Sequence, residues 1–280
     1  MDHSNMPLQP ADYAEPRCLL CGEPYGAETP VRPVPQQRII EKMDEYMARR
    51  DYAGAEKHLL YWLQEAELGH DGRGRLMLLG ELVGHYRKTG EKEKSLARGE
   101  EALALLKELD YEDSISAGTA YVNVATACSA FGAPERALEL FEKAREVYEK
   151  NAQTRPQLLG GLYNNMALVC ASLGRYAQAH GLYDRAMECM QRVPGGALEQ
   201  AITCLNRADA VAAERGAEEG ESAIAALLDE AWALLHAPDV PKDGYCAFVY
   251  EKCAPSFGYY GRFLDEDELK REAEALYERA

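Results

Sequence analysis

Residues 162–190, LYNNMALVCASLGRYAQAHGLYDRAMECM, decide the fold of this chain. The stretch divides at Gly174 into two segments, and in each of them apolar residues recur three and four positions apart. That spacing is typical of a helix with one buried face. A glycine between two helices favours a tight turn, because the left-handed conformation that ends a helix costs little without a Cβ atom. The stretch therefore predicts a helical hairpin.

Related hairpins recur along the chain at a constant interval. Each has a glycine after its first helix, and each glycine follows the previous one by 42 residues (132−90, 174−132, 216−174 and 258−216). The unit at Gly216 needs about three extra residues in its turn before Ile224 falls into register. Such an interval predicts stacked repeats that bury a core between neighbours. The glycines are Gly90, Gly132, Gly174, Gly216 and Gly258.

The order of large and small residues resembles the tetratricopeptide repeat (TPR), in which a large, large, small, aromatic series precedes a small, aromatic, small series. The interval exceeds the usual ~34 residues by about one helical turn per helix. Such lengthened repeats are similar to those of kinesin light chains and certain bacterial TPR regulators. HEAT or armadillo repeats are the alternative, but the small residues Ala167 and Ala179 favour TPR. The matching residues are Tyr163, Met166, Ala167, Cys170, Ala179, Tyr183 and Ala186.

The resemblance implies an all-α fold, a right-handed TPR superhelix (α-solenoid) of about six helix pairs. Residues 1–35 are expected to form a proline-rich N-terminal tail, and residues 36–280 the helical repeat domain. The last pair, about 243–280, is expected to be atypical because it must finish the stack. The expected helices are 35–48, 51–70, 74–88, 92–109, 114–130, 134–151, 156–173, 176–191, 197–215, 219–236, 245–253 and 265–280.

Two features distinguish the C-terminal pair. Asp265 is the expected N-cap of the closing helix, because an aspartate side chain accepts hydrogen bonds from the first backbone amides. An aromatic run precedes it, and this run forms either a cap or a patch that binds a partner or a second copy. The run consists of Phe257, Tyr259, Tyr260 and Phe263.

Composition narrows the functional classes. The net charge is −16, which argues against a nucleic-acid partner and favours a neutral or basic protein partner. No apolar run approaches the roughly 18 to 20 residues of a membrane span. No basic segment followed by an apolar one marks a secretory signal. We therefore expect a protein that neither spans a membrane nor is exported.

The eight cysteines do not form a disulfide framework. Cys128 and Cys170 occupy the same core position of successive repeats, and Cys246 and Cys253 lie seven residues apart on one helix, about 10 Å along the axis. That separation is too long for an unstrained bridge. Buried free thiols in a reducing compartment are the simplest account, which predicts a cytoplasmic protein.

The N-terminal tail carries a CxxC motif. Cys18 and Cys21 have the ligand spacing of a zinc knuckle, but they supply only half of a tetrahedral site. His3, a second chain or a fold-back of the tail onto a later cysteine would have to complete it. A redox function of the thioredoxin type would need a βαβ context, which the sequence lacks. Zinc binding or a redox response at this motif is therefore an alternative to an ordinary thiol pair, and no other cofactor is predicted.

A polar row lies beside the packing positions of the first helices. Asn123, Asn165 and Arg207 stand at intervals of 42 residues, as do Asn164 and Asn206. The Asn164-Asn165 pair before Met166-Ala167 resembles the Asn-Asn-Leu-Ala segment of the lengthened repeats. The resemblance implies that this row faces the concave surface, where such asparagines grip a peptide backbone. In the repeat before them Glu81 replaces asparagine, and Arg87 adds positive charge.

Two interpretations of the row stay open. The amides bind a peptide, since a carboxamide supplies two donors and an acceptor, or they brace neighbouring helices. Catalytic motifs such as a glycine-rich phosphate loop are absent, so we expect a non-catalytic scaffold. The basic clamp of chaperone-binding TPR domains is not reproduced. A further alternative is a peptide-sensing TPR regulator, which would act through a partner because no DNA-binding domain is found.

Overall fold

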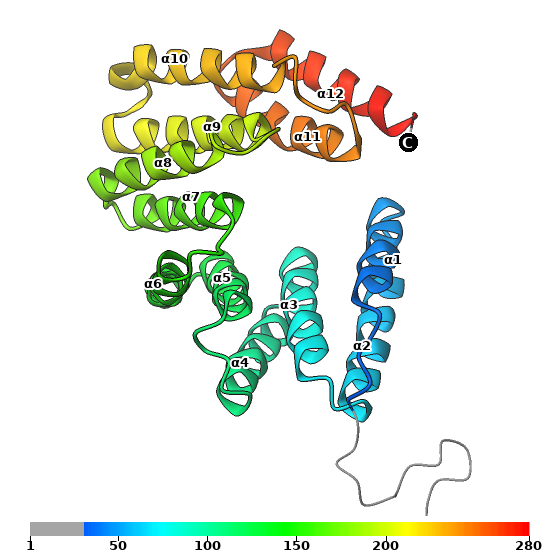
Figure 1. Ribbon diagram of the computed structural model, residues 1–280. Helices are drawn as coiled ribbons and strands as arrows, with labels where there is room; N and C mark the ends of the chain where they lie inside the picture. The colour runs from blue at the N-terminus through cyan, green and yellow to red at the C-terminus, as the bar shows by residue number, and fades with distance from the viewer. Residues whose placement is uncertain (1–30, 280) are drawn as a thin grey trace, which may run out of the picture. The chain divides into compact units, whose positions relative to one another are not determined.

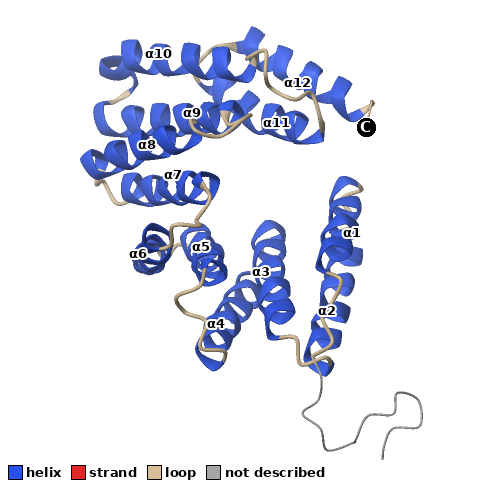
Figure 2. Ribbon diagram, viewed as in Figure 1, coloured by secondary structure: helices blue, strands red, loops and turns tan. Residues whose placement is uncertain are grey.

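The computed structural model describes residues 31–279, and within that range the chain is helical and contains no strand (Figures 1 and 2). It divides into two compact units, Met1–Leu82 and Val83–Ala280. The twelve described helices confirm the predicted all-α architecture of about six helix pairs. They are α1 (Gln36–Ala48), α2 (Tyr52–Leu68), α3 (Gly72–Thr89), α4 (Lys92–Glu108), α5 (Ile115–Ala130), α6 (Pro134–Lys150), α7 (Pro156–Ser172), α8 (Tyr176–Met190), α9 (Ala197–Arg215), α10 (Ala217–Leu235), α11 (Gly244–Tyr259) and α12 (Phe263–Tyr277).

The first unit contains α1, α2 and most of α3. Ile39, Leu59 and Leu79 contribute one fully buried side chain from each of these helices. Asp71 is also buried, and its carboxylate accepts the backbone N–H groups of Val34 and Gly74, both at 2.9 Å. This side chain therefore caps α3 and fixes the segment before α1, because each bond satisfies an amide that otherwise lacks a partner.

The second unit is a stack of hairpins. The pairs α5/α6, α7/α8, α9/α10 and α11/α12 are each in contact, and α6 and α8 also contact the first helix of the following pair. The first helices contact one another in the series α5, α7, α9 and α11 (Figure 1). Residues at equivalent positions of successive repeats therefore lie on helices that contact each other.

Glycines end the first helices by the predicted mechanism. Gly132 and Gly174 have φ values of 79° and 71°, in the left-handed region. At the first of them the amide of Ala133 donates to the carbonyl of Cys128 at 2.9 Å, and the amide of Gly132 to that of Ser129 at 3.1 Å. These two bonds define a Schellman motif, which satisfies carbonyls at the end of α5.

The last glycine of the predicted series does not have this function. Gly258 lies inside α11, and Gly261, three residues later, has φ 80° and ends the helix. The predicted helix 245–253 was therefore too short, although Pro255 lies within the extended part. Phe257 explains the extension, because its fully buried ring contacts Trp232 edge to face at 5.7 Å and keeps this segment in the core.

Two further helix starts differ from the prediction. The extra residues after Gly216 are not in a turn, because α10 begins at Ala217 and extends the helix at its N-terminus. The closing helix α12 begins at Phe263, so Asp265 lies in its first turn and is not the N-cap. Acidic side chains in a first turn still interact favourably with the helix dipole, which makes the two positions hard to distinguish in sequence.

Candidate functional site

The asparagine row divides into two parts in the structure. Asn164 of α7 and Asn206 of α9 are half-buried, and the amide of Asn206 donates to the carboxamide oxygen of Asn164 at 3.1 Å. This bond joins equivalent positions of successive repeats across the contact between α7 and α9. These two side chains therefore brace neighbouring first helices, as the second interpretation predicts.

Asn123 of α5 and Asn165 of α7 behave differently. Both side chains are half-buried, and neither makes a side-chain hydrogen bond to any residue in the described part of the chain. A half-exposed carboxamide without a protein partner is hydrated, and a ligand amide can replace that water at little net cost. This part of the row therefore has hydrogen-bonding capacity that the described residues do not use.

The remaining predicted residues lie in different surroundings. Arg207 of α9 forms an ion pair with Asp184 of α8, with its nitrogen 2.7 Å from the carboxylate, so it links two helices. Arg87 is exposed in the last turn of α3 and belongs to the second unit. Glu81 belongs to the first unit, where burial and the nearby charge of Asp44 raise the pKa of its carboxyl.

A hollow of about 940 Å³ opens between α9, the start of α10 and the end of α11. Asp209 in its wall lies three residues after Asn206, and Ala213 one turn further, so the row and the hollow share a face of α9. The hydroxyl of Tyr260 donates to Asp209 at 2.7 Å, while Tyr259 is 80% exposed. The lining residues are Asp209, Ala212, Ala213, Ala217, Pro255, Ser256, Tyr259 and Tyr260.

Sequence reasoning missed Asp209 because an isolated acidic residue on a helix is usually solvated. The pKa of its carboxyl lies above the usual value, because the effect of burial exceeds the opposing effect of the hydrogen bond from Tyr260. The aromatic run indicated part of the hollow, because Tyr259 and Tyr260 belong to both. Phe257 is buried, as expected of a cap, whereas Tyr259 is exposed, and partner binding by this run stays a prediction.

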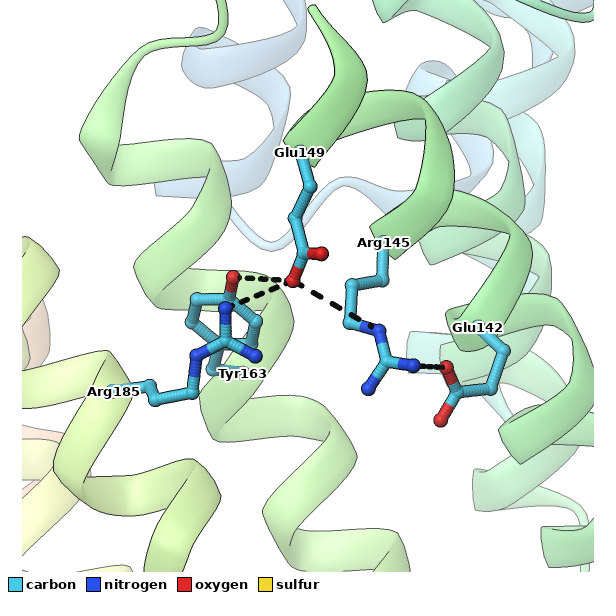
Figure 3. Close-up of polar contacts among 5 residues, drawn as sticks. All are labelled: Glu142, Arg145, Glu149, Tyr163 and Arg185. Atoms are coloured by element: carbon cyan, nitrogen blue, oxygen red, sulfur yellow. Dashed lines mark hydrogen bonds and ion pairs between the residues drawn. The ribbon is translucent and has the colours of Figure 1, made fainter.

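A polar network supports the helix that carries Asn164 and Asn165 (Figure 3). The Tyr163 hydroxyl and the Arg185 guanidinium both donate to one oxygen of Glu149, each at 2.9 Å. The same guanidinium lies 4.2 Å from the centre of the Tyr163 ring. These contacts connect α6, α7 and α8, so they fix the orientation of α7 and of the asparagines next to Tyr163.

The cysteines divide into the CxxC motif of the tail and the thiols of the helices. Cys18 and Cys21 lie outside the described residues, so zinc binding or a redox response there stays a prediction. The cysteines within the described range are free thiols, and Cys128, Cys170, Cys204, Cys246 and Cys253 are buried. Burial raises the pKa of the Cys128 and Cys170 thiols, which makes them poor nucleophiles.

Comparison with known proteins supports the repeat assignment. Residues 74–150 and 160–195 match family models described as "Tetratricopeptide repeat". No curated protein matches the chain. Among solved structures, the chain is similar to BtubC (BKLC) from P. vanneervenii, with 18% identity, a TM-score of 0.51, and coverage of 87% of this chain and 91% of the other.

A second similar structure is a kinesin light chain-like protein from Podosopora anserina with nearly identical TPR-like repeats. Its identity is 17% and its TM-score is 0.51, with coverage of 72% of this chain and 94% of that one. At these identities the likeness concerns the fold. Family matches and fold together show that residues 74–150 and 160–195 are tetratricopeptide repeats, as the sequence predicted, within an array of the same fold. None of the described helices is long and apolar enough to cross a membrane.

Proposed function

We propose that the second unit binds an extended segment of a partner protein along the first helices α5, α7 and α9. TPR arrays are typical of protein-interaction scaffolds, because stacked repeats create extended binding surfaces. The single observation that carries the proposal is that Asn123 and Asn165, at equivalent positions of contacting helices, have carboxamides without a hydrogen-bond partner in residues 31–279. The alternative of a peptide-sensing regulator would use the same surface.

The spacing of the helices suits an extended peptide. Packed helices lie about 8–10 Å apart, and an extended chain advances about 3.3 Å per residue. Asn123 and Asn165 would therefore meet backbone amides about three residues apart in the ligand. Each carboxamide can donate to a carbonyl and accept from an N–H, which replaces the bonds that the peptide loses on leaving water.

The charge of the protein favours a neutral or basic ligand. The net charge is −16, and the hollow beside the row combines apolar walls with the carboxylate of Asp209. A lysine or arginine side chain fits such a hollow, because its stem is apolar and its head is cationic. The proposal includes no catalytic step and no nucleic-acid partner. It places the protein in the cytoplasm, where the buried free thiols remain reduced.

The test uses a peptide selected from a random library for binding to the wild-type protein. We expect Asn123→Ala with Asn165→Ala to lower its affinity about tenfold or more, since each lost hydrogen bond is worth roughly 0.5–1.5 kcal/mol. The melting temperature should not change, because these side chains make no hydrogen bond within the described array. Fluorescence anisotropy and thermal unfolding measure the two quantities.

Two variants serve as controls. Asn151→Ala removes an asparagine outside the row, whose oxygen accepts the Gln153 amide at 3.0 Å, and should leave the affinity unchanged. Asn164→Ala with Asn206→Ala breaks the bracing bond and should lower the melting temperature. Equal peptide affinity of the wild type and the Asn123, Asn165 double variant would show that the row does not bind the ligand.

A further inference from the structure

Three potential metal ligands converge at the C-terminal end of the second unit. His236 follows the last residue of α10, while Glu268 and Glu272 lie four residues apart on α12. One ligand atom from each of the three lies within 4.8 Å of the other two. Residues at i and i+4 share a helix face, so both carboxylates of α12 are directed to the imidazole.

The imidazole of His236 has the tautomer that metal coordination through Nε2 requires. Its Nδ1 lies 2.9 Å from the carbonyl oxygen of Trp232. A carbonyl oxygen only accepts, so Nδ1 carries the proton and the lone pair is on Nε2. This Nε2 is shielded from solvent, has no hydrogen-bond partner among the described residues, and lies 3.8 Å from a Glu272 oxygen. A backbone carbonyl behind Nδ1 is the usual support of a histidine that binds metal.

Aromatic neighbours hold the ring in this orientation. The centre of the His236 ring lies 4.2 Å from that of Trp232 and 5.8 Å from that of Tyr250. Rotation of the imidazole about its side chain would disrupt both contacts and the bond to the Trp232 carbonyl. The unpartnered Nε2 is therefore held facing α12, where a buried nitrogen without a partner costs free energy unless something binds it.

We propose that His236, Glu268 and Glu272 bind one divalent transition-metal ion, with Zn²⁺ as the best match to one imidazole and two carboxylates. Zinc bonds to such ligands are about 2.0–2.2 Å long, which places the ligands of a tetrahedral site about 3.3 Å apart. The observed separations exceed this by at most about 1.5 Å, a distance that glutamate side chains cover by changing rotamer. Three protein ligands leave a fourth position for water.

The ion would replace a weaker cation. Lys242 has its ammonium 3.9 Å from Glu272, and it also donates to the hydroxyl of Tyr250. The ammonium of Lys242 forms an ion pair with Glu272 and not with Glu268. Glu268 has no ion-pair or hydrogen-bond partner among the residues described. A bound ion would neutralise both and would join α10 to α12, which stabilises the pair that ends the stack.

The test uses the full chain with Cys18→Ser and Cys21→Ser, so that the other candidate site cannot contribute. After chelation, Zn²⁺ is titrated and binding is followed by calorimetry and by the melting temperature. We expect one ion per chain and a rise in melting temperature. His236→Gln and Glu268→Gln should each weaken binding about tenfold or more. Glu268 makes no hydrogen bond or ion pair within the described structure, so the second variant should fold normally.

His180→Gln is the matched control. His180 also faces a carboxylate, with Nε2 3.1 Å from Glu214, but no second carboxylate joins them within the described structure. This variant should bind Zn²⁺ as the parent does. Absence of binding, equal binding by all variants, or intense near-ultraviolet thiolate bands with Co²⁺ in place of Zn²⁺ would each overturn the proposal.

Discussion

Single glycines determine where the hairpins turn, and the backbone angle distinguishes them from other glycines. Gly174 has φ 71°, and a Cβ atom added there would meet nothing within 4 Å, so its requirement for glycine is conformational and not steric. Gly181 of the same hairpin is exposed inside α8, has no positive φ and likewise has open space around it. The two positions differ only in backbone conformation.

This difference predicts opposite effects of the same substitution. Gly174→Ala should destabilise the protein by about 1–2 kcal/mol, because alanine is strained in the left-handed region. Gly181→Ala should stabilise it by up to about 1 kcal/mol, because alanine favours the helix. Urea unfolding followed by circular dichroism measures both. A loss of stability in the Gly181 variant as large as that in the Gly174 variant would contradict this explanation.

At the scale of the helices, the 42-residue register pairs a glycine of the first helix with a large residue of the second helix in two successive hairpins. In the α5/α6 hairpin a Cβ atom on Gly118 would lie 2.2 Å from the buried ring of Tyr148. In the α7/α8 hairpin a Cβ atom on Gly160 would lie 2.8 Å from the terminal methyl of Met190. A ring held on all sides cannot yield, whereas a thioether chain can adopt another rotamer.

We therefore expect Gly118→Ala to destabilise the protein by roughly 1–3 kcal/mol through overpacking. Gly160→Ala should cost less than about 1 kcal/mol, since Met190 moves aside and alanine favours the helix. Chemical unfolding of the two variants provides the comparison. If Gly160→Ala proves the more harmful, the stiffness of the neighbouring side chain is not what determines the cost.

At the scale of the whole molecule, the core contains buried cysteine and tyrosine side chains that are uncharged at neutral pH. Burial raises the pKa of the Cys204 and Cys253 thiols to about 12, from 9.0 for a free cysteine, and both side chains are only 2% exposed. Burial also raises the pKa of Tyr183 and Tyr250 above the usual value. In each case the folded state holds its proton more tightly than the unfolded state does.

The free energy of unfolding should therefore fall in alkali. A pKa that folding raises contributes stability that is complete below the unfolded value and disappears as the pH rises through the folded value. For the two thiols this loss begins near pH 9.0 and extends to about 12. Urea titrations at a series of pH values measure it. Cys204→Ala should reduce the slope against pH, and an unchanged stability up to pH 11 would contradict the prediction.

The local pattern of the sequence determined the repeat architecture. Helix periodicity and the interval of 42 residues depend on neighbours along the chain, so they predict the helix pairs and the turns at Gly132 and Gly174 without any long-range contact. The C-terminal exception arose where this local signal met a long-range contact. Burial of Phe257 against Trp232 extends α11 past Pro255 and moves the turn to Gly261.

Only the tertiary structure decided what the polar side chains do. The sequence placed Asn164, Asn165 and Asn206 in one row, but a shared register does not reveal which amides bond to each other. His236 and Glu272 are likewise 36 residues apart and meet only because the residue after α10 lies beside α12 in the folded chain. Hydrogen bonding and coordination depend on distances of a few ångströms between helices, and those distances are set by packing, which a repeat pattern does not encode.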